Sequence, residues 1–188
     1  MTTSRIEIIC GPMFSGKTDE LLRRLNRLKY SRNEFLLFKP KLDNRYSELS
    51  VVTHDNKSTN SLSVENAEQI LEVCDQNSHI KVVAVDESQF FLRKEPVGRN
   101  LVEVCQLLRA NGYRVILNGL DMDFMGNPFG LMPELMAISD DVRKLTSVCL
   151  VCGADATMTH RVDENQEVVE LGSTDKYQAR CFEHWKKS

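Results

Sequence analysis

Short apolar runs alternate along most of the chain with longer segments in which apolar residues recur at helical spacing. Four short apolar runs predict buried strands, at 5–10, 34–39, 80–85 and 113–117. Three longer segments carry Leu, Ile and Val at helical spacing and predict helices, at 16–30, 64–74 and 101–108. This order predicts an α/β fold, with a mostly parallel sheet flanked by helices. Ligands of such sheets bind beyond the carboxyl ends of the strands, where the runs lead into Gly11, Asp86 and Gly119.

The pattern changes from about Lys144 onward. Two close cysteines are followed by apolar segments at 156–162 and 168–171, which predict the strands of a hairpin. We therefore expect an α/β core at 1–143 and a small metal-stapled module at 144–188. The stretch 44–63 is polar and rich in Ser, Thr and Asn, and a loop of this length is either functional or mobile.

Composition narrows the class of protein and its partners. The chain has 188 residues, 41% of them hydrophobic and 27% charged, so it can bury a sizeable core. Lys and Arg number 24 against 27 Asp and Glu, and the net charge of −3 provides no overall positive field, so we expect no nucleic acid partner. No apolar run approaches the roughly 20 residues of a membrane span. The first residues lack the apolar region of a signal peptide, so we expect a cytoplasmic protein without a membrane partner.

A phosphate-binding motif follows the first predicted strand. The pattern G-x-x-x-x-G-K-[ST] is matched by Gly11, Pro12, Met13, Phe14, Ser15, Gly16, Lys17 and Thr18. Its glycines let backbone N–H groups face the phosphates, and the following helix adds the positive end of its dipole. Lys17 would reach the β- and γ-phosphates, and the Thr18 hydroxyl would ligate Mg²⁺. The motif lies between a predicted strand and a predicted helix, which indicates a P-loop NTPase-type core that binds a nucleoside triphosphate such as ATP.

Two carboxylates end the apolar strand at 80–85. Asp86 would hold the Mg²⁺ shell through water, in the arrangement of a Walker B acid. Glu87 is then available to accept a proton from the group that attacks the γ-phosphorus. The residues themselves leave open whether that group is water or a substrate hydroxyl. Guanine specificity is unsupported, because the nearest match to N-K-x-D, at 56–59, ends in Thr59.

The last part of the chain carries four potential zinc ligands. They form two C-x-x-C/H pairs separated by 28 residues, and they are Cys149, Cys152, Cys181 and His184. Because all four ligands would come from the protein, the spacing predicts a structural Zn²⁺ site. The remaining histidines, His54, His79 and His160, stand alone and are interpreted as ordinary surface or packing residues.

These motifs together resemble the type II thymidine kinases, the cytosolic, zinc-containing family. The resemblance covers nearly the whole chain. It includes the phosphate loop, D-N-R-Y at 43–46 with T-H-D at 53–55, D-E-S-Q-F at 86–90, G-L-D at 119–121, and the segment from Gly172 through Asp175-Lys176-Tyr177 to Cys181 and His184. The residue after Cys181, commonly basic in that family, is Phe182 here, which leaves the zinc ligands unaffected.

The resemblance implies an ATP-dependent transfer of phosphate to the 5′-hydroxyl of thymidine, with Glu87 as general base. It implies that Arg45 and Gln89 join the phosphate-binding set and that Asp43 helps hold the metal, although the sequence alone would favour a surface ion pair for Asp43 and Arg45. A lasso at about 159–177 would cover the nucleoside. The nucleoside pocket would contain Phe90, Leu120, Phe124, Gly172 and Tyr177. Pattern alone would place the two Phe residues in the core. The family is usually a homotetramer that dTTP inhibits.

A rival hypothesis is an NTPase regulated by nucleic acid, in which the zinc module senses the nucleic acid and Glu87 activates water. The acidic composition and the lack of length for a second motor domain count against it.

Overall fold

A six-stranded sheet forms the centre of the computed structural model, which describes residues 4–41, 50–52, 58–162 and 176–186. The strand order is β5-β2-β6-β7-β1-β8, and every neighbouring pair is parallel. The strands are β1 (Arg5–Gly11), β2 (Leu36–Pro40), β5 (Leu62–Val64), β6 (Val82–Val85), β7 (Arg114–Leu120) and β8 (Asp141–Lys144). The predicted α/β fold with a mostly parallel sheet is therefore confirmed.

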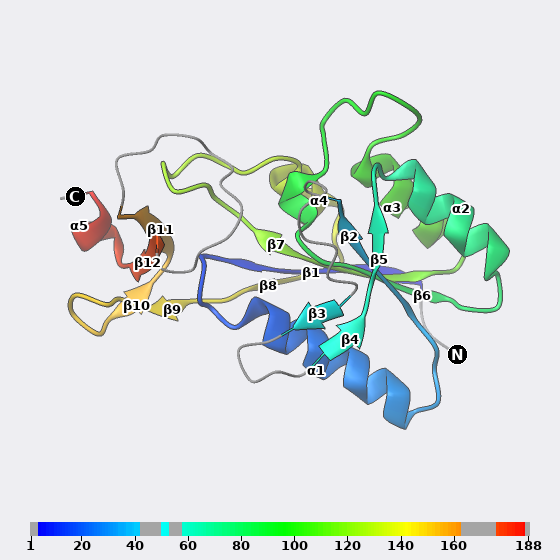
Figure 1. Ribbon diagram of the computed structural model, residues 1–188, viewed down its shortest axis with the longest axis horizontal. Coiled ribbons are helices and arrows are strands. Elements are labelled where there is room, and N and C mark those ends of the chain that lie inside the picture. Colours follow the sequence, from blue (N-terminus) through cyan, green and yellow to red (C-terminus); the bar gives the residue numbers. More distant parts are fainter. Residues whose placement is uncertain (1–3, 42–49, 53–57, 163–175, 187–188) are drawn as a thin grey trace.

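Helices cover both faces of this sheet (Figure 1). One face is covered by α1 (Lys17–Tyr30), whose Leu21, Leu22, Leu25 and Leu28 pack on alternate residues of the strands. The other face is covered by α2 (Glu68–Gln76), α3 (Leu101–Ala110) and α4 (Met132–Ile138). Because the central strands are buried on both faces, they appear in the sequence as continuous apolar runs rather than as alternating ones.

Small elements surround the sheet. An antiparallel pair is formed by β3 (Ser50–Val52) and β4 (Ser58–Asn60), and a short 3₁₀ helix, η1 (Ser88–Phe90), follows β6. Beyond the carboxyl end of the sheet lie β9 (Ser147–Val148) with β10 (Asp155–Ala156), β11 (Met158–Arg161) with β12 (Tyr177–Arg180), and α5 (Phe182–Trp185) (Figure 1). No helix in the described ranges is long and apolar enough to cross a membrane.

Some element boundaries differ from the sequence-based expectations. The helix expected from Val64 begins at Glu68, because Val64 is the last residue of β5 and its carbonyl oxygen accepts a hydrogen bond from the Lys41 backbone N–H at 2.8 Å. The strand expected at 156–162 is β11, and it pairs with β12. The partner strand expected at 168–171 lies outside the described residues. Neither α4 nor β8 was predicted from the sequence.

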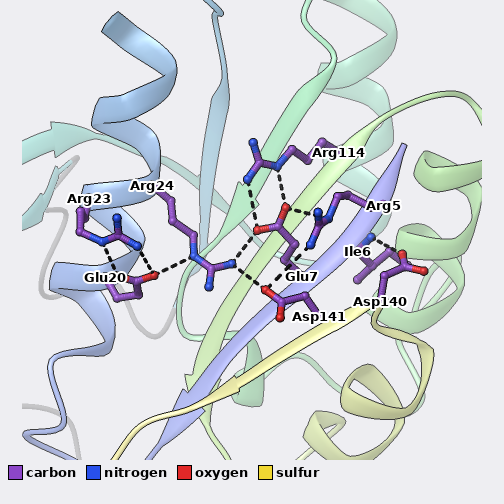
Figure 2. A network of polar contacts seen from close by, with 9 residues as sticks. All are labelled: Arg5, Ile6, Glu7, Glu20, Arg23, Arg24, Arg114, Asp140 and Asp141. Atoms are coloured by element: carbon purple, nitrogen blue, oxygen red, sulfur yellow. Dashed lines mark hydrogen bonds and ion pairs between the residues drawn. The ribbon is translucent and has the colours of Figure 1, made fainter. Parts of the chain in front are cut away.

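A network of ionic side chains lies on the α1 side of the sheet, toward the amino end of β1 (Figure 2). At its centre is Glu7, which is only 3% exposed and accepts hydrogen bonds from Arg24 at 2.6 Å and Arg114 at 2.7 Å. Arg5 pairs with the same carboxylate at 3.0 Å. Burial by itself raises the pKa of Glu7, but the hydrogen bond from Arg114 and the three positive charges outweigh burial, so that pKa lies below its ordinary value.

Candidate active site

The phosphate loop connects β1 to α1 at the carboxyl edge of the sheet. Gly11, the last residue of β1, has a φ of 142°, and a Cβ there would collide with the carbonyl oxygen of Leu145. Gly16 caps α1 in the left-handed conformation with a φ of 75°. Glycine suits both positions because it has no Cβ. The loop therefore has the strand-loop-helix setting expected from the sequence, and the amino end of α1 borders the site.

Lys17 lies at the start of α1 and folds back over the loop. Its Nζ donates a hydrogen bond to the Pro12 carbonyl oxygen at 2.6 Å, and the Ser15 hydroxyl donates to the same oxygen at 2.9 Å. Burial lowers the pKa of Lys17, while the nearby carboxylates of Glu87, Asp86 and Asp121 act in the opposite direction. Asp121, on the loop after β7, pairs with Lys144 at 2.7 Å. Lys17 thus lies close enough to three acidic side chains to interact with their charges.

Asp86 lies at the end of β6 and is 5% exposed. Its Oδ1 accepts a hydrogen bond from the Asn118 side-chain amide and another from the Glu87 backbone N–H at 3.0 Å. Burial, followed by the charge of Glu87, raises the pKa of Asp86 to about 7. Asn118 on β7 was missed by the sequence analysis. Its signal is a polar residue in an otherwise buried apolar strand, where it needs a hydrogen-bond partner.

Glu87 follows directly and has a left-handed backbone, with φ 54° and ψ 41°. Its side chain is exposed, whereas Gln89 in η1 is 2% exposed. The Gln89 amide donates to Glu87 Oε2 at 2.5 Å, and its carbonyl oxygen accepts from the Leu120 backbone N–H at 3.0 Å. A non-glycine residue held in this backbone conformation costs free energy, and such residues cluster at functional sites.

The structure brings together some of the expected nucleoside-pocket residues. The rings of Phe124 and Tyr177 each lie with their centroid 5.5 Å from the guanidinium carbon of Arg161. Arg161 is 6% exposed and was missed by the sequence analysis. Phe90 packs edge-on against Phe129, with ring centroids 5.6 Å apart. The expected site residues Asp43, Arg45 and Gly172 lie outside the described residues.

The C-terminal module contacts the loops that surround the site. The Met13 backbone N–H donates to the Thr159 hydroxyl at 3.0 Å, and the Ser147 hydroxyl donates to the Phe14 carbonyl oxygen at 3.0 Å. Trp185 donates its indole N–H to the Phe124 carbonyl oxygen at 3.0 Å. The module is therefore hydrogen-bonded both to the phosphate loop and to the loop that carries Phe124.

The four expected metal ligands come together in this module. The ligand atoms of Cys149, Cys152, Cys181 and His184 all lie within 4.8 Å of one another. Cys152 Sγ and Cys181 Sγ are 3.8 Å apart. Zn–S bonds of about 2.3 Å in a tetrahedral site place two sulfurs about 3.8 Å apart, so this donor set fits zinc. Backbone N–H groups, first that of Cys181, lower the pKa of the Cys149 thiol to about 6, which favours the thiolate that zinc binds.

The histidines expected to be ordinary are not part of this cluster where they are described. His79 is exposed and lies 3.5 Å from Glu34, and His160 lies on β11, where burial and the charge of Arg180 lower its pKa. His54 lies outside the described residues.

Comparisons with known proteins cover nearly the whole chain. The family model described as thymidine kinase matches residues 4–185. A thymidine kinase of Bacteroides thetaiotaomicron is 48% identical over 179 residues, which are 95% of this chain and 85% of that protein. A thymidine kinase of Rhodothermus sp. is 47% identical over 94% of this chain and 78% of its own length. One of Bdellovibrio bacteriovorus is 44% identical over 98% of this chain and 87% of its own length.

A solved structure shares the fold. The genome packaging NTPase B204 of Sulfolobus turreted icosahedral virus 2, in complex with ATP-gammaS, superposes with a TM-score of 0.51. The match covers 79% of this chain and 76% of that one, at 16% sequence identity. At this identity the similarity concerns the fold, which is the P-loop type of sheet and loop.

Proposed function

The chain belongs to the thymidine kinase family, and on this premise we propose the roles of its residues when the γ-phosphate of ATP passes to the 5′-hydroxyl of thymidine. The observation that carries the proposal is the meeting of Lys17, Asp86 and Glu87 at the carboxyl edge of the sheet. A phosphate-binding cation, a metal-binding acid and a base are the parts that phosphoryl transfer requires.

The phosphate loop would bind the triphosphate. Its backbone N–H groups and the amino end of α1 offer partial positive charge to the phosphate oxygens. Lys17 donates a hydrogen bond to the Pro12 carbonyl oxygen in this structure. When ATP binds, Lys17 would instead contact the β- and γ-phosphates. The virus NTPase with the same fold was solved with ATP-gammaS, which supports a nucleoside triphosphate at this loop.

Mg²⁺ would accompany ATP and be held by the Thr18 hydroxyl and the Asp86 carboxylate, with Asp43 as a third group. The donor chemistry fits, because Asp86 is a buried carboxylate beside a second carboxylate, an arrangement that a divalent cation relieves. The ion would supply positive charge for the transferring phosphoryl group. Asn118 would orient the Asp86 carboxylate for this task.

Glu87 would act as the general base. The carboxylate takes the proton of the 5′-hydroxyl while that oxygen forms its bond to the γ-phosphorus, and the bond between the γ-phosphorus and the β,γ-bridging oxygen breaks, so that ADP leaves. The exposure of Glu87 supports this role, since the carboxylate is accessible to a second substrate. The nucleoside would be surrounded by Phe90, Leu120, Phe124, Gly172 and Tyr177. The Arg161 guanidinium, which contacts the rings of Phe124 and Tyr177, would help to position both.

These roles assign a function to each of the two parts of the chain. Residues 1–143 would form the nucleotide-binding core and 144–188 the module that covers the nucleoside, with zinc fixing its two ends. We extend the proposal to Arg45 at the phosphates, to a cytoplasmic homotetramer and to inhibition by dTTP, each of which rests on the family resemblance.

The test measures the chemical step in two variants. Glu87→Gln should lower kcat by about 10²- to 10⁴-fold with little change in the affinity for ATP, because it removes a base and keeps the shape. Lys17→Ala should weaken ATP binding and transfer together. A scan of nucleosides that follows ATP consumption, run beside phosphate release in the presence of DNA or RNA, separates the kinase from the rival NTPase. Near-normal turnover of Glu87→Gln contradicts the assignment of the base.

A further inference from the structure

Gln89 holds a position between the proposed base and the strand that leads to the nucleoside pocket. Its side chain is 2% exposed, so its amide has few partners besides protein atoms. Among the described residues, the amide nitrogen donates to Glu87 Oε2 at 2.5 Å and the carbonyl oxygen accepts from the Leu120 backbone N–H at 3.0 Å. One side chain thus links the end of β6 to the end of β7.

The direction of these two hydrogen bonds is fixed by chemistry. A backbone N–H can only donate, so the group that faces Leu120 must be the amide oxygen. The NH₂ group must then face Glu87. It binds one carboxylate oxygen, Oε2, and leaves Oε1 to accept a proton. Neither a glutamate, which at neutral pH cannot donate, nor a methionine, which has no amide, can make both contacts at position 89.

Both the side chain and the backbone of Gln89 are closely packed. A Cβ on Gly119 would lie 2.6 Å from the side-chain amide oxygen of Gln89. A Cβ on Gly130 would collide with the backbone carbonyl oxygen of Gln89. Glycine at these two positions, one on β7 and the other before α4, allows the backbone to approach Gln89 this closely. Glu87, in contrast, has an exposed side chain and a left-handed backbone, so it needs a support of this kind to keep one orientation.

We propose that Gln89 is a positioning residue for Glu87: it fixes the carboxylate through Oε2 and sets its place relative to the nucleoside side of the site through Leu120. This inference rests on the proposed role of Glu87 as base. It replaces direct phosphate binding as the task of Gln89, because both ends of the buried amide are already engaged by protein groups. A displacement of about 1 Å of a reacting group can cost on the order of 10²-fold in rate.

Two substitutions separate the two halves of the amide. Gln89→Met has a similar length and makes neither hydrogen bond, whereas Gln89→Glu keeps an acceptor for Leu120 and loses the donor to Glu87. Because the donor positions the base, both variants should lower kcat by about 10- to 100-fold. In Gln89→Met, which adds no charge, the KM values for ATP and thymidine should each change by less than about threefold, since an interaction that serves the transition state alone affects kcat. If Gln89 bound phosphate, the KM for ATP would rise instead.

Gln69→Met is the matched control. The Gln69 carbonyl oxygen also accepts a backbone N–H, that of Glu65 at 2.8 Å, but it does so in the first turn of α2, away from the site. This variant loses a hydrogen bond of the same kind and should keep the kcat of the parent. Thermal unfolding of all variants shows that they remain folded, and the near-isosteric Gln89→Glu provides the comparison if Gln89→Met does not fold.

A double variant decides whether Gln89 acts through Glu87. If it does, Gln89→Met should add less than about threefold to the loss of kcat already caused by Glu87→Gln, because residues that act as a unit are not additive. Losses that multiply would overturn the inference, and so would a near-normal kcat in Gln89→Met and Gln89→Glu, while the proposed base would stand. Near-normal turnover in Glu87→Gln would instead contradict the base itself.

Discussion

Replacement of Glu7 by Gln tests whether the ionic network on β1 stabilises the fold. Glu7 is a buried carboxylate that faces three guanidinium groups, of which Arg24 and Arg114 have side chains only 13% and 25% exposed. Gln at this position keeps the shape and one acceptor oxygen. It removes the negative charge and turns an NH₂ donor toward groups that are themselves donors.

The expected magnitude follows from these exposures. Removal of one partner of a fully buried ion pair costs about 3–5 kcal/mol. Because water can reach part of both guanidinium groups and one acceptor remains, we expect Glu7→Gln to lower the free energy of unfolding by about 2–3 kcal/mol. For a chain of this length that corresponds to a decrease of about 4–12 °C in Tm. Glu7 lies toward the amino end of β1 and the phosphate loop follows its carboxyl end, so kcat well below Tm should not change.

Urea and thermal unfolding measure this effect, with Glu65→Gln as the control. Glu65 pairs with Lys41 at 2.9 Å, but both side chains are exposed, so its loss should cost less than about 1 kcal/mol. An equal Tm for Glu7→Gln and Glu65→Gln would refute the reasoning, because it would mean that burial of the carboxylate adds nothing.

The pH dependence of the unfolding free energy provides an independent test of the same reasoning. Since the network holds the pKa of Glu7 below its ordinary value, its contribution to stability is complete above the pKa of Glu in the unfolded chain, about 4.3, and is lost as the pH falls through the lower pKa of the folded state. The difference in unfolding free energy between the parent and Glu7→Gln should therefore stay constant from pH 7 to about 5 and shrink below that. A difference that grows in acid would contradict this account.

Two further predictions concern the C-terminal module. Cys152→Ser should lose zinc, measured by metal content. In separate titrations it should bind thymidine much more weakly than the parent does and retain more of its ATP binding, because the metal anchors the proposed lasso; a folded, zinc-free variant with the parent's affinity for thymidine would contradict it. Trp185→Phe removes the indole N–H that binds the Phe124 carbonyl oxygen and should raise the KM for thymidine by about 3- to 10-fold without loss of zinc. An unchanged KM would show that this hydrogen bond does not support the pocket.

The features predicted from the sequence are those whose signal is local. The buried strands have continuous apolar runs, the phosphate loop has its glycines, and the zinc ligands have their paired spacing within a few residues. The strand β8 lacks such a signal, because it lies at the edge of the sheet and most of its side chains are exposed. The helix α4 has only seven residues, too few for a clear helical period.

The contacts missed within the site are those that tertiary structure creates. Asn118 meets Asp86 between neighbouring strands, Thr159 meets the phosphate loop from the C-terminal module, and Arg161 lies against two aromatic rings. Nothing in the neighbouring sequence of these residues identifies their partners. A buried polar residue does indicate that a partner exists, and Asn118 could have been singled out on that ground.

The position of β1 has a consequence for how the protein folds during synthesis. This strand is made first, yet its two neighbours in the sheet are β7 and β8, which are translated more than a hundred residues later. Until they emerge from the ribosome, β1 has neither of its hydrogen-bonding partners, and non-local pairing of this kind is slow. The phosphate loop at the end of β1 would therefore gain its shape late, so a nascent chain would acquire the ability to bind nucleotide only when nearly all of the sheet has left the ribosome.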